Sequence, residues 1–237
     1  MPIMLRLAAT LFVLLVTTGS ASAATTWYTV ELIAFQHLSG DGLYGENWPS
    51  TPGEPAVHNA VRLTRSGELA LEDETEQAGS AAIPYAYQLL GQSSFRLTDV
   101  SSRLKWSDGY RPLLHIAWHQ PGLSKSSSKA IYVHSALPNR FRNDATAADG
   151  LAGIPELEGT IRVSRARYLH VDADLVHFRR APVGSEVDAT QFRMQQSRRL
   201  RSKEVHYIDH PLFGLIVLIT PYEPAEIFSE EQAQSSE

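Results

Sequence analysis

The fold class of this chain is decided by the segment Tyr168-Leu169-His170-Val171-Asp172-Ala173-Asp174-Leu175-Val176-His177-Phe178. Within it, the apolar residues Leu169, Val171, Ala173 and Leu175 alternate with polar residues. In an extended chain, successive side chains point to opposite faces, so a period of two separates the two kinds. The segment is therefore predicted to be a strand with one buried face and one wet face.

Segments of similar composition surround this strand. Residues 157–163 are predicted to pair with it as a hairpin. The remaining strands are predicted at residues 27–35, 113–118, 131–133, 191–200 and 205–220. Together they predict an α+β fold, with a mostly antiparallel sheet, one or two packed helices and long surface loops.

One helix is predicted between the first two strands. Leu97, Val100 and Leu104 lie at helical spacing, with Thr98 as the expected cap, and Gly109 and Pro112 are expected to end the helix. Residues 37–82 are rich in Gly, Pro and Ser and predict a long flexible loop, and residues 139–150 and 181–190 predict shorter ones. Residues 229–237 are expected to be a disordered tail.

Aromatic residues add to the expected core. Five of them fall in or beside regular elements and are expected to be buried: Trp27, Tyr28, Phe35, Trp106 and Trp118. Trp48 lies in the Gly- and Pro-rich region and is expected to fold back onto the core.

The first 23 residues have the organisation of a secretory signal peptide. Arg6 precedes a short apolar run at 7–16, and small residues follow, ending in Ala21-Ser22-Ala23. The run is shorter than the roughly 20 apolar residues that span a bilayer, and no later segment is long enough to span one. We expect cleavage after Ala23, a periplasmic location, no membrane span in the mature chain, and a single domain at residues 24–228.

Composition excludes several kinds of protein. The chain has no cysteine, which rules out a disulfide scaffold, a thiolate metal site and lipid attachment at the cleavage site. With 21 Lys and Arg against 26 Asp and Glu, its net charge is −5. There is no overall basic excess, so nucleic acid is not an expected partner.

Polar residues gather late in the chain in two groups. The first contains Arg165, Arg167, Tyr168, His170, Asp172 and Asp174. The second contains Arg198, Arg199, Arg201, Glu204, His206, Tyr207, Asp209 and His210. Because the strands that carry them are predicted neighbours, both groups are expected to share one face.

These groups allow three interpretations. His170, His206 and His210, with Asp172 or Asp209, would suit zinc or iron. However, Pro211 disfavours the helix that would align His206 with His210. The favoured interpretation is a wet sheet face closed by pairs among Arg, Asp and His.

The third interpretation is recognition of an acidic polymer. The planar arginine fork pairs with carboxylates, such as those that end cell-wall peptide stems, and sugars stack on aromatic side chains. A charged edge strand that resists aggregation is an equal alternative. Because the chain lacks a Gly-x-Ser-x-Gly elbow and a phosphate-binding loop, neither an enzyme nor a cofactor is expected.

Several blocks, taken in order, carry a resemblance. They are Tyr28-Thr29-Val30-Glu31-Leu32-Ile33-Ala34-Phe35, Glu46-Asn47-Trp48-Pro49, Leu113-Leu114-His115-Ile116-Ala117-Trp118-His119-Gln120-Pro121, Glu158-Gly159-Thr160-Ile161, Arg167-Tyr168-Leu169-His170-Val171, Gln196-Ser197-Arg198-Arg199-Leu200-Arg201-Ser202 and Glu204-Val205-His206-Tyr207-Ile208-Asp209-His210-Pro211-Leu212-Phe213-Gly214. With these blocks the chain resembles the CsiV family of periplasmic peptidoglycan-binding proteins.

The resemblance implies a non-catalytic factor that binds peptidoglycan and supports cell-wall synthesis and cell shape. It implies partnership with an LpoA-type outer-membrane lipoprotein, which activates a class A penicillin-binding protein. No catalytic residue carries over. The expected ligand-binding residues are Arg167, Tyr168, His170, Arg198, Arg199, Arg201, His206, Tyr207, Asp209 and His210. The alternatives are a periplasmic metal-dependent hydrolase using the His and Asp cluster, and a module that binds only a protein partner.

Overall fold

The computed structural model describes residues 25–39, 41–44, 46–49, 51–65, 86–137, 155–180 and 189–224. The predicted signal peptide, the loop at 139–150, most of the loop at 181–190 and the tail at 229–237 lie outside these residues.

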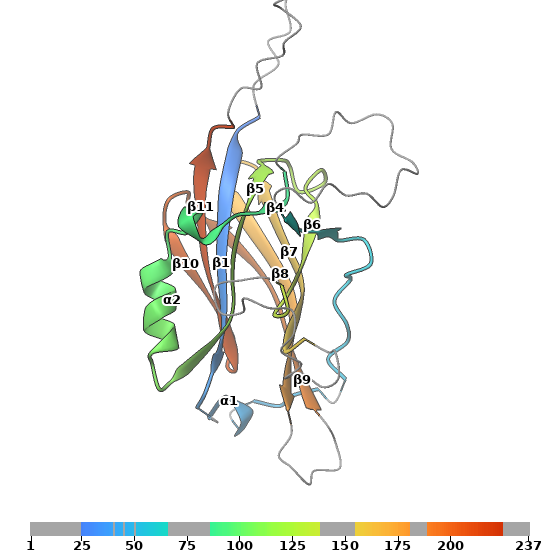
Figure 1. The fold of residues 1–237 in the computed structure, drawn as a ribbon. Helices are drawn as coiled ribbons and strands as arrows, with labels where there is room; N and C mark the ends of the chain where they lie inside the picture. The colour runs from blue at the N-terminus through green and yellow to red at the C-terminus, as the bar shows by residue number, and fades with distance from the viewer. Residues whose placement is uncertain are drawn as a thin grey trace, which may run out of the picture.

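Two sheets form the body of the protein (Figure 1). Sheet A contains, in spatial order, β10 (Val205–Asp209), β11 (Phe213–Tyr222), β1 (Trp27–His37), β5 (Tyr110–Pro121), β4 (Gln88–Leu89) and β3 (Thr64–Arg65). Sheet B contains β2 (Val61–Arg62), β6 (Ala130–His134), β7 (Leu157–Arg165), β8 (Leu169–Arg180) and β9 (Ala189–Leu200). The helices are α1 (Asp41–Tyr44), the 3₁₀ turn η1 (Gln92–Ser94) and α2 (Thr98–Lys105).

The long strand pairs are antiparallel, and the predicted α+β, mostly antiparallel fold is confirmed. Only the short pairs β2–β6 and β3–β4 are parallel among the described strands. The predicted hairpin is also confirmed, because β7 and β8 pair with Ile161 opposite Ala173. The division into two sheets was not part of the prediction.

The main core lies between the two sheets. Sheet A contributes Leu32 and Trp118, and sheet B contributes Ile161, Leu175 and Phe192, all nearly inaccessible to solvent. The alternation predicted for β8 is confirmed: Leu169, Val171, Ala173 and Leu175 face inward. Period-two patterning thus selects the buried face of β8.

Trp48 folds back onto this core, as predicted. Its ring packs edge-on against Phe192, with 5.1 Å between ring centroids. The indole nitrogen donates a hydrogen bond to the carbonyl of Gly42 at 3.2 Å. The polar end of the large side chain is therefore satisfied while its apolar surface is sheltered.

Helix α2 covers the outer face of sheet A. A second apolar cluster lies there, in which Leu97, Val100 and Leu104 pack on Ile33 and Leu218. As a consequence, β1 is buried on both faces, and its sequence is a nearly continuous run of apolar residues.

The start of α2 is held by a side chain from the sheet. Thr98 was predicted to be the cap, but the cap position is Leu97, which forms no side-chain cap hydrogen bond. Instead, the buried carboxylate of Glu31 accepts hydrogen bonds from the backbone N–H groups of Arg96 and Leu97, at 2.8 and 2.9 Å. It also lies 2.7 Å from Nε2 of His115.

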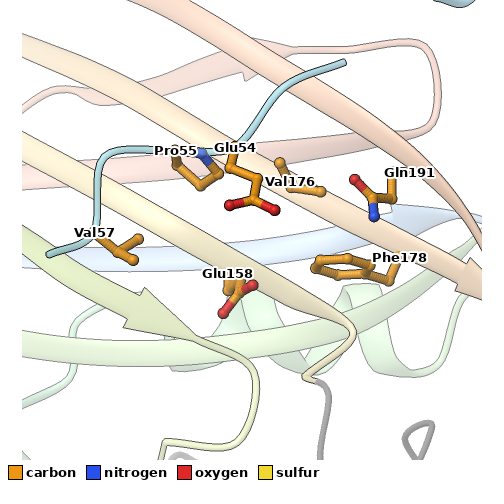
Figure 2. A pocket seen from close by; sticks show the side chains of 7 residues that line it. All are labelled: Glu54, Pro55, Val57, Glu158, Val176, Phe178 and Gln191. Carbon is orange, nitrogen blue, oxygen red and sulfur yellow. The ribbon is translucent and has the colours of Figure 1, made fainter. Parts of the chain in front are cut away.

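Two further expectations are corrected. Trp106 was expected in the core but is 82% exposed, because α2 ends at Lys105 and the following residues turn into solvent. Residues 37–82 were expected to be a loop throughout, yet α1, β2 and β3 lie within them. The extended segment at residues 51–60, here called the strap, passes over the outer face of sheet B (Figure 2).

Candidate functional site

The two predicted groups of polar residues do not lie on one face, because the second group is divided between the two sheets. Strand β9, which carries Arg198 and Arg199, belongs to sheet B, whereas β10, which carries Tyr207 and Asp209, belongs to sheet A. The turn between them takes the chain from one sheet to the other. Neighbouring strands in sequence were assumed to be neighbours in one sheet, and a sandwich breaks that assumption.

Exposed basic side chains gather at one end of the sandwich. There, β8 begins beside the end of β9, with Leu169 opposite Leu200 and His170 opposite Arg199. The β7–β8 turn and the turn after β9 lie at this end as well. Together they expose six basic residues, which we call the basic end: Arg165, Arg167, Arg198, Arg199, Arg201 and Lys203.

An aromatic ring positions one of these cations. The guanidinium of Arg199 lies 4.6 Å from the centroid of the Tyr168 ring. A cation over an aromatic face is attracted by the ring quadrupole, which holds the Arg199 stem while its outer edge stays free to bind an anion. Arg201 pairs weakly with Glu204 at 3.6 Å, and both are largely exposed. Such a pair competes little with a ligand.

His206 closes the turn at the basic end. Its Nε2 lies 3.0 Å from the backbone nitrogen of Arg201, which donates to it. This contact gives His206 a structural role at the point where the chain changes sheets.

Tyr207 lies on the outer face of sheet A in a group we call the aromatic patch, which consists of Phe35, His37, Tyr110 and Tyr207. Asp209 lies beside this patch. The Tyr207 ring stacks on Phe35 with centroids 6.0 Å apart, and Tyr110 meets Phe35 edge-on at 5.3 Å. The Tyr207 hydroxyl donates to the carboxylate of Asp209 and lies 3.4 Å from Nε2 of His37. Burial, with added effect from Asp209, raises the pKa of Tyr207.

The aromatic patch joins residues that are distant in sequence. Tyr207 is 52% exposed and Tyr110 is 41% exposed, so both offer aromatic surface to solvent. Of these residues, Tyr207 was predicted from the sequence to bind ligand, whereas His37 and Tyr110 were not. They meet it only because β1 pairs with both β5 and β11, and β11 pairs with β10.

His210 lies in the interior. Its ring packs against Phe213 and Trp48, with centroids 4.4 and 5.2 Å apart. Burial, together with the nearby His177, lowers the pKa of His210 to about 4. A neutral, enclosed imidazole cannot contact a polymer at the surface.

The metal-site interpretation finds no support in the geometry. His170 lies on sheet B, His206 contacts the backbone of the turn after β9, and His210 lies in the core. Within the described ranges, no group of three or more His, Cys, Asp or Glu side chains is placed to hold a metal ion. The hydrolase alternative therefore lacks its ligand set.

Two aspartates on the outer face of sheet B form charge pairs, with partners that lie outside the predicted groups. Asp172 pairs with Lys125 at 2.9 Å, and Asp174 forms a two-pronged pair with Arg193 at 2.7 and 2.8 Å. Burial opposes ionisation of Asp172, but hydrogen bonds from Ser197 and Lys125 outweigh it and lower the pKa of this carboxyl.

Comparison with known proteins assigns the chain to a family. In the part of the chain that the structure describes, no helix is long and apolar enough to cross a membrane. Searches of curated proteins and of solved structures each gave no match. The family model described as "Peptidoglycan-binding protein, CsiV" matches residues 6–222, which is most of the sequence. The chain therefore belongs to the CsiV family of peptidoglycan-binding proteins.

Proposed function

We propose that this protein is a non-catalytic peptidoglycan-binding factor of the periplasm, exported by a cleaved signal peptide at residues 1–23. The family assignment supports wall binding and a place in the cell envelope. The observation that carries the proposed site is the basic end, where six exposed cations gather on an otherwise acidic chain.

The ligand group of the basic end is the carboxylate of a peptide stem. Arginine forks pair with carboxylates through two parallel hydrogen bonds, and Arg199 is already oriented by Tyr168. Because the contacts are exposed, their energy falls as salt screens them. The proposed ligand-binding residues at the basic end are Arg167, Tyr168, His170, Arg198, Arg199 and Arg201. His206 contributes by holding the turn after β9. His210 is left out because it is buried.

Co-sedimentation with isolated sacculi tests this proposal. The protein should pellet with sacculi in about 0.05 M salt and be released near 0.5 M, where the screening length is only a few ångströms. Replacing Arg198, Arg199 and Arg201 together by Met should abolish most of the binding. The charge-matched control replaces Arg96, Arg103 and Lys105, exposed cations in or beside α2, by Met. Equal loss in both variants would contradict the proposed site.

Chemical modification of the wall identifies the group that is recognised. Sacculi whose free carboxylates have been converted to amides should bind the protein several-fold less, because the anionic partner of arginine is gone. Undiminished binding to amidated sacculi would exclude carboxylate recognition by the basic end.

Tyr207 and Asp209 form a second proposed contact, through the aromatic patch. Sugar rings stack on exposed aromatic faces, and the adjacent carboxylate can accept hydrogen bonds from hydroxyls. The variant Tyr207→Ala should weaken the binding that persists on amidated sacculi. If it has no effect there, the glycan does not use this patch.

Support of cell-wall synthesis and cell shape is proposed to pass through an LpoA-type lipoprotein and a class A penicillin-binding protein. Purified lipoprotein, immobilised and exposed to this protein without wall material, tests the link directly. Retention would establish contact between the two proteins. If the protein is not retained but still binds sacculi, it is a wall-binding protein that acts without this partner.

A further inference from the structure

A hollow of about 270 Å³ lies beneath the strap on the outer face of sheet B. The strap contributes Glu54, Pro55 and Val57, while Glu158 comes from β7 and Phe178 from β8 (Figure 2). Val176 and Gln191 complete its walls. Val176 is six residues along β8 from His170, which places the hollow roughly 20 Å from the basic end.

Dedicated contacts hold the strap over the sheet. Arg193, already paired with Asp174, donates a further hydrogen bond to the carbonyl of Pro52 at 3.1 Å. Gly53 has φ +74°, and a Cβ at this position would lie 2.7 Å from a guanidinium nitrogen of Arg193. A side chain there would be strained and would collide with Arg193, so the close approach needs glycine.

Two carboxylates line the hollow without a cation between them. Within the described residues, neither Glu54 nor Glu158 forms an ion pair. Glu158 accepts a hydrogen bond from the hydroxyl of Tyr132 at 2.9 Å, which orients the carboxylate. Burial of the phenol, together with this hydrogen bond, raises the pKa of Tyr132 to about 12. The hydroxyl therefore stays protonated and continues to donate.

The walls of the hollow restrict which cation it suits. Calcium needs six to eight oxygen ligands, and two carboxylates beside Val176 and Phe178 do not provide them. A primary ammonium group needs only three acceptors, and the aliphatic chain behind it gains by covering apolar surface. The amide of Gln191 offers a third acceptor oxygen at the edge.

We propose that this hollow binds a primary ammonium group on an aliphatic chain, as carried by lysine and other diamino acids. Glu54 and Glu158 pair with the ammonium, while Val176, Phe178 and Pro55 cover its methylene groups. This site is separate from the basic end and the aromatic patch, and it does not rest on the proposed function.

Titration with small probes, followed by amide shifts in NMR spectra of the labelled protein, tests the proposal. Nα-acetyl-lysine N-methylamide should shift the amides of Val57, Val176, Phe178 and Gln191 in a saturable way. Nα-acetyl-norleucine N-methylamide, which has the chain without the charge, should bind about tenfold more weakly or not at all. Equal binding of the two probes, or stronger binding of calcium chloride, would overturn the assignment.

Matched variants locate the site. Glu54→Gln and Glu158→Gln should each lower the affinity for the lysine probe by about fivefold, which is the scale expected for losing one partly exposed ion pair. Glutamine keeps an acceptor for Tyr132, so Glu158→Gln is expected to fold. The control is Glu223→Gln, an exposed glutamate beyond β11, which should leave the affinity unchanged. If the control weakens binding as much, the probe is responding only to net charge.

The source of the amine is resolved by two peptides of equal length. One carries a free diamino-acid amine like that of a wall stem, and the other carries lysine in an ordinary polypeptide sequence. The tighter binder identifies the natural source. If neither peptide binds and Nα-acetyl-lysine N-methylamide does not bind either, the proposal is overturned.

Discussion

On the outer face of sheet A, α2 packs over Ile33 and Leu218 and the buried carboxylate of Glu31 anchors its start. On the outer face of sheet B, ion pairs of Asp172 and Asp174 lie near the surface and a strap crosses without covering the whole sheet. Similar strands therefore serve different ends: α2 covers part of the outer face of sheet A and leaves the aromatic patch exposed beside it, whereas the outer face of sheet B leaves charged groups and a hollow open to ligands.

The largest expected effect follows from removing the anchor of sheet A. Glu31→Leu leaves two backbone N–H groups and His115 without their buried partner, and should cost about 3 to 5 kcal/mol of unfolding free energy. Chemical denaturation measures this loss. Glu204→Leu, at an exposed acid of the basic end, should change stability by at most about 0.5 kcal/mol. Similar losses of stability in both variants would contradict the anchoring role of Glu31.

The interior shared by both sheets should respond to acid. The folded protein holds His210 at a pKa of about 4, below the ordinary value of about 6.5, so the unfolded chain binds a proton first as pH falls. Stability should therefore be constant above pH 6.5 and decline by about 3 kcal/mol on going down to pH 4. Burial lowers the pKa of His177 too, which acts in the same direction.

Unfolding measured from pH 8 to pH 4 checks this slope. His210→Phe should flatten it, because the titrating group is removed from the core. His170→Phe, on the outer face of sheet B, is the surface control, and its slope should match that of the unmodified protein. An unchanged slope in His210→Phe would show that another group governs acid stability.

A smaller effect is expected from releasing the strap on sheet B. Arg193→Lys keeps the charge but cannot pair with Asp174 through two prongs and also reach Pro52. We expect a loss of about 1 kcal/mol and greater backbone motion at residues 53–57 in heteronuclear NOE measurements. Arg103→Lys on α2 is the control. If the strap stays rigid in Arg193→Lys, other contacts hold it.

The smallest effect concerns Trp106, which directly follows the last residue of α2. Trp106→Ser should change the unfolding free energy by at most about 0.5 kcal/mol, because its ring is mostly in solvent. Trp118→Ala, at a fully buried ring, should cost about 3 to 5 kcal/mol in the same assay. A large loss in Trp106→Ser would mean that this tryptophan shields a surface in solution.

Much of the fold could be predicted because strand patterning is local. The alternation in β8, the β7–β8 hairpin and the shelter of Trp48 each follow from side-chain chemistry within a short segment. The burial of Trp106 was predicted wrongly because helical spacing does not show where the helix stops relative to its sheet. Glu31 was missed as an anchor because its partners lie 65 residues or more away.

The candidate site, like the fold, could be predicted from the sequence only in part. The charges of Arg198, Arg199 and Arg201 and the ring of Tyr168 are visible in the sequence, and the pairing of β8 with β9 brings Arg199 to Tyr168. The separation of Tyr207 and Asp209 from these residues depends on β10 joining sheet A, which no local pattern shows.

The sequence alone was enough to predict the buried face of β8, the clustering of the basic residues and the family that the chain resembles. Only the tertiary structure decided that β9 and β10 belong to different sheets, that His210 is enclosed and that Glu54 meets Glu158 across a hollow. The physical reason is range: alternation and charge act between neighbours in sequence. The sheet a strand joins depends on burying apolar area contributed by the whole chain.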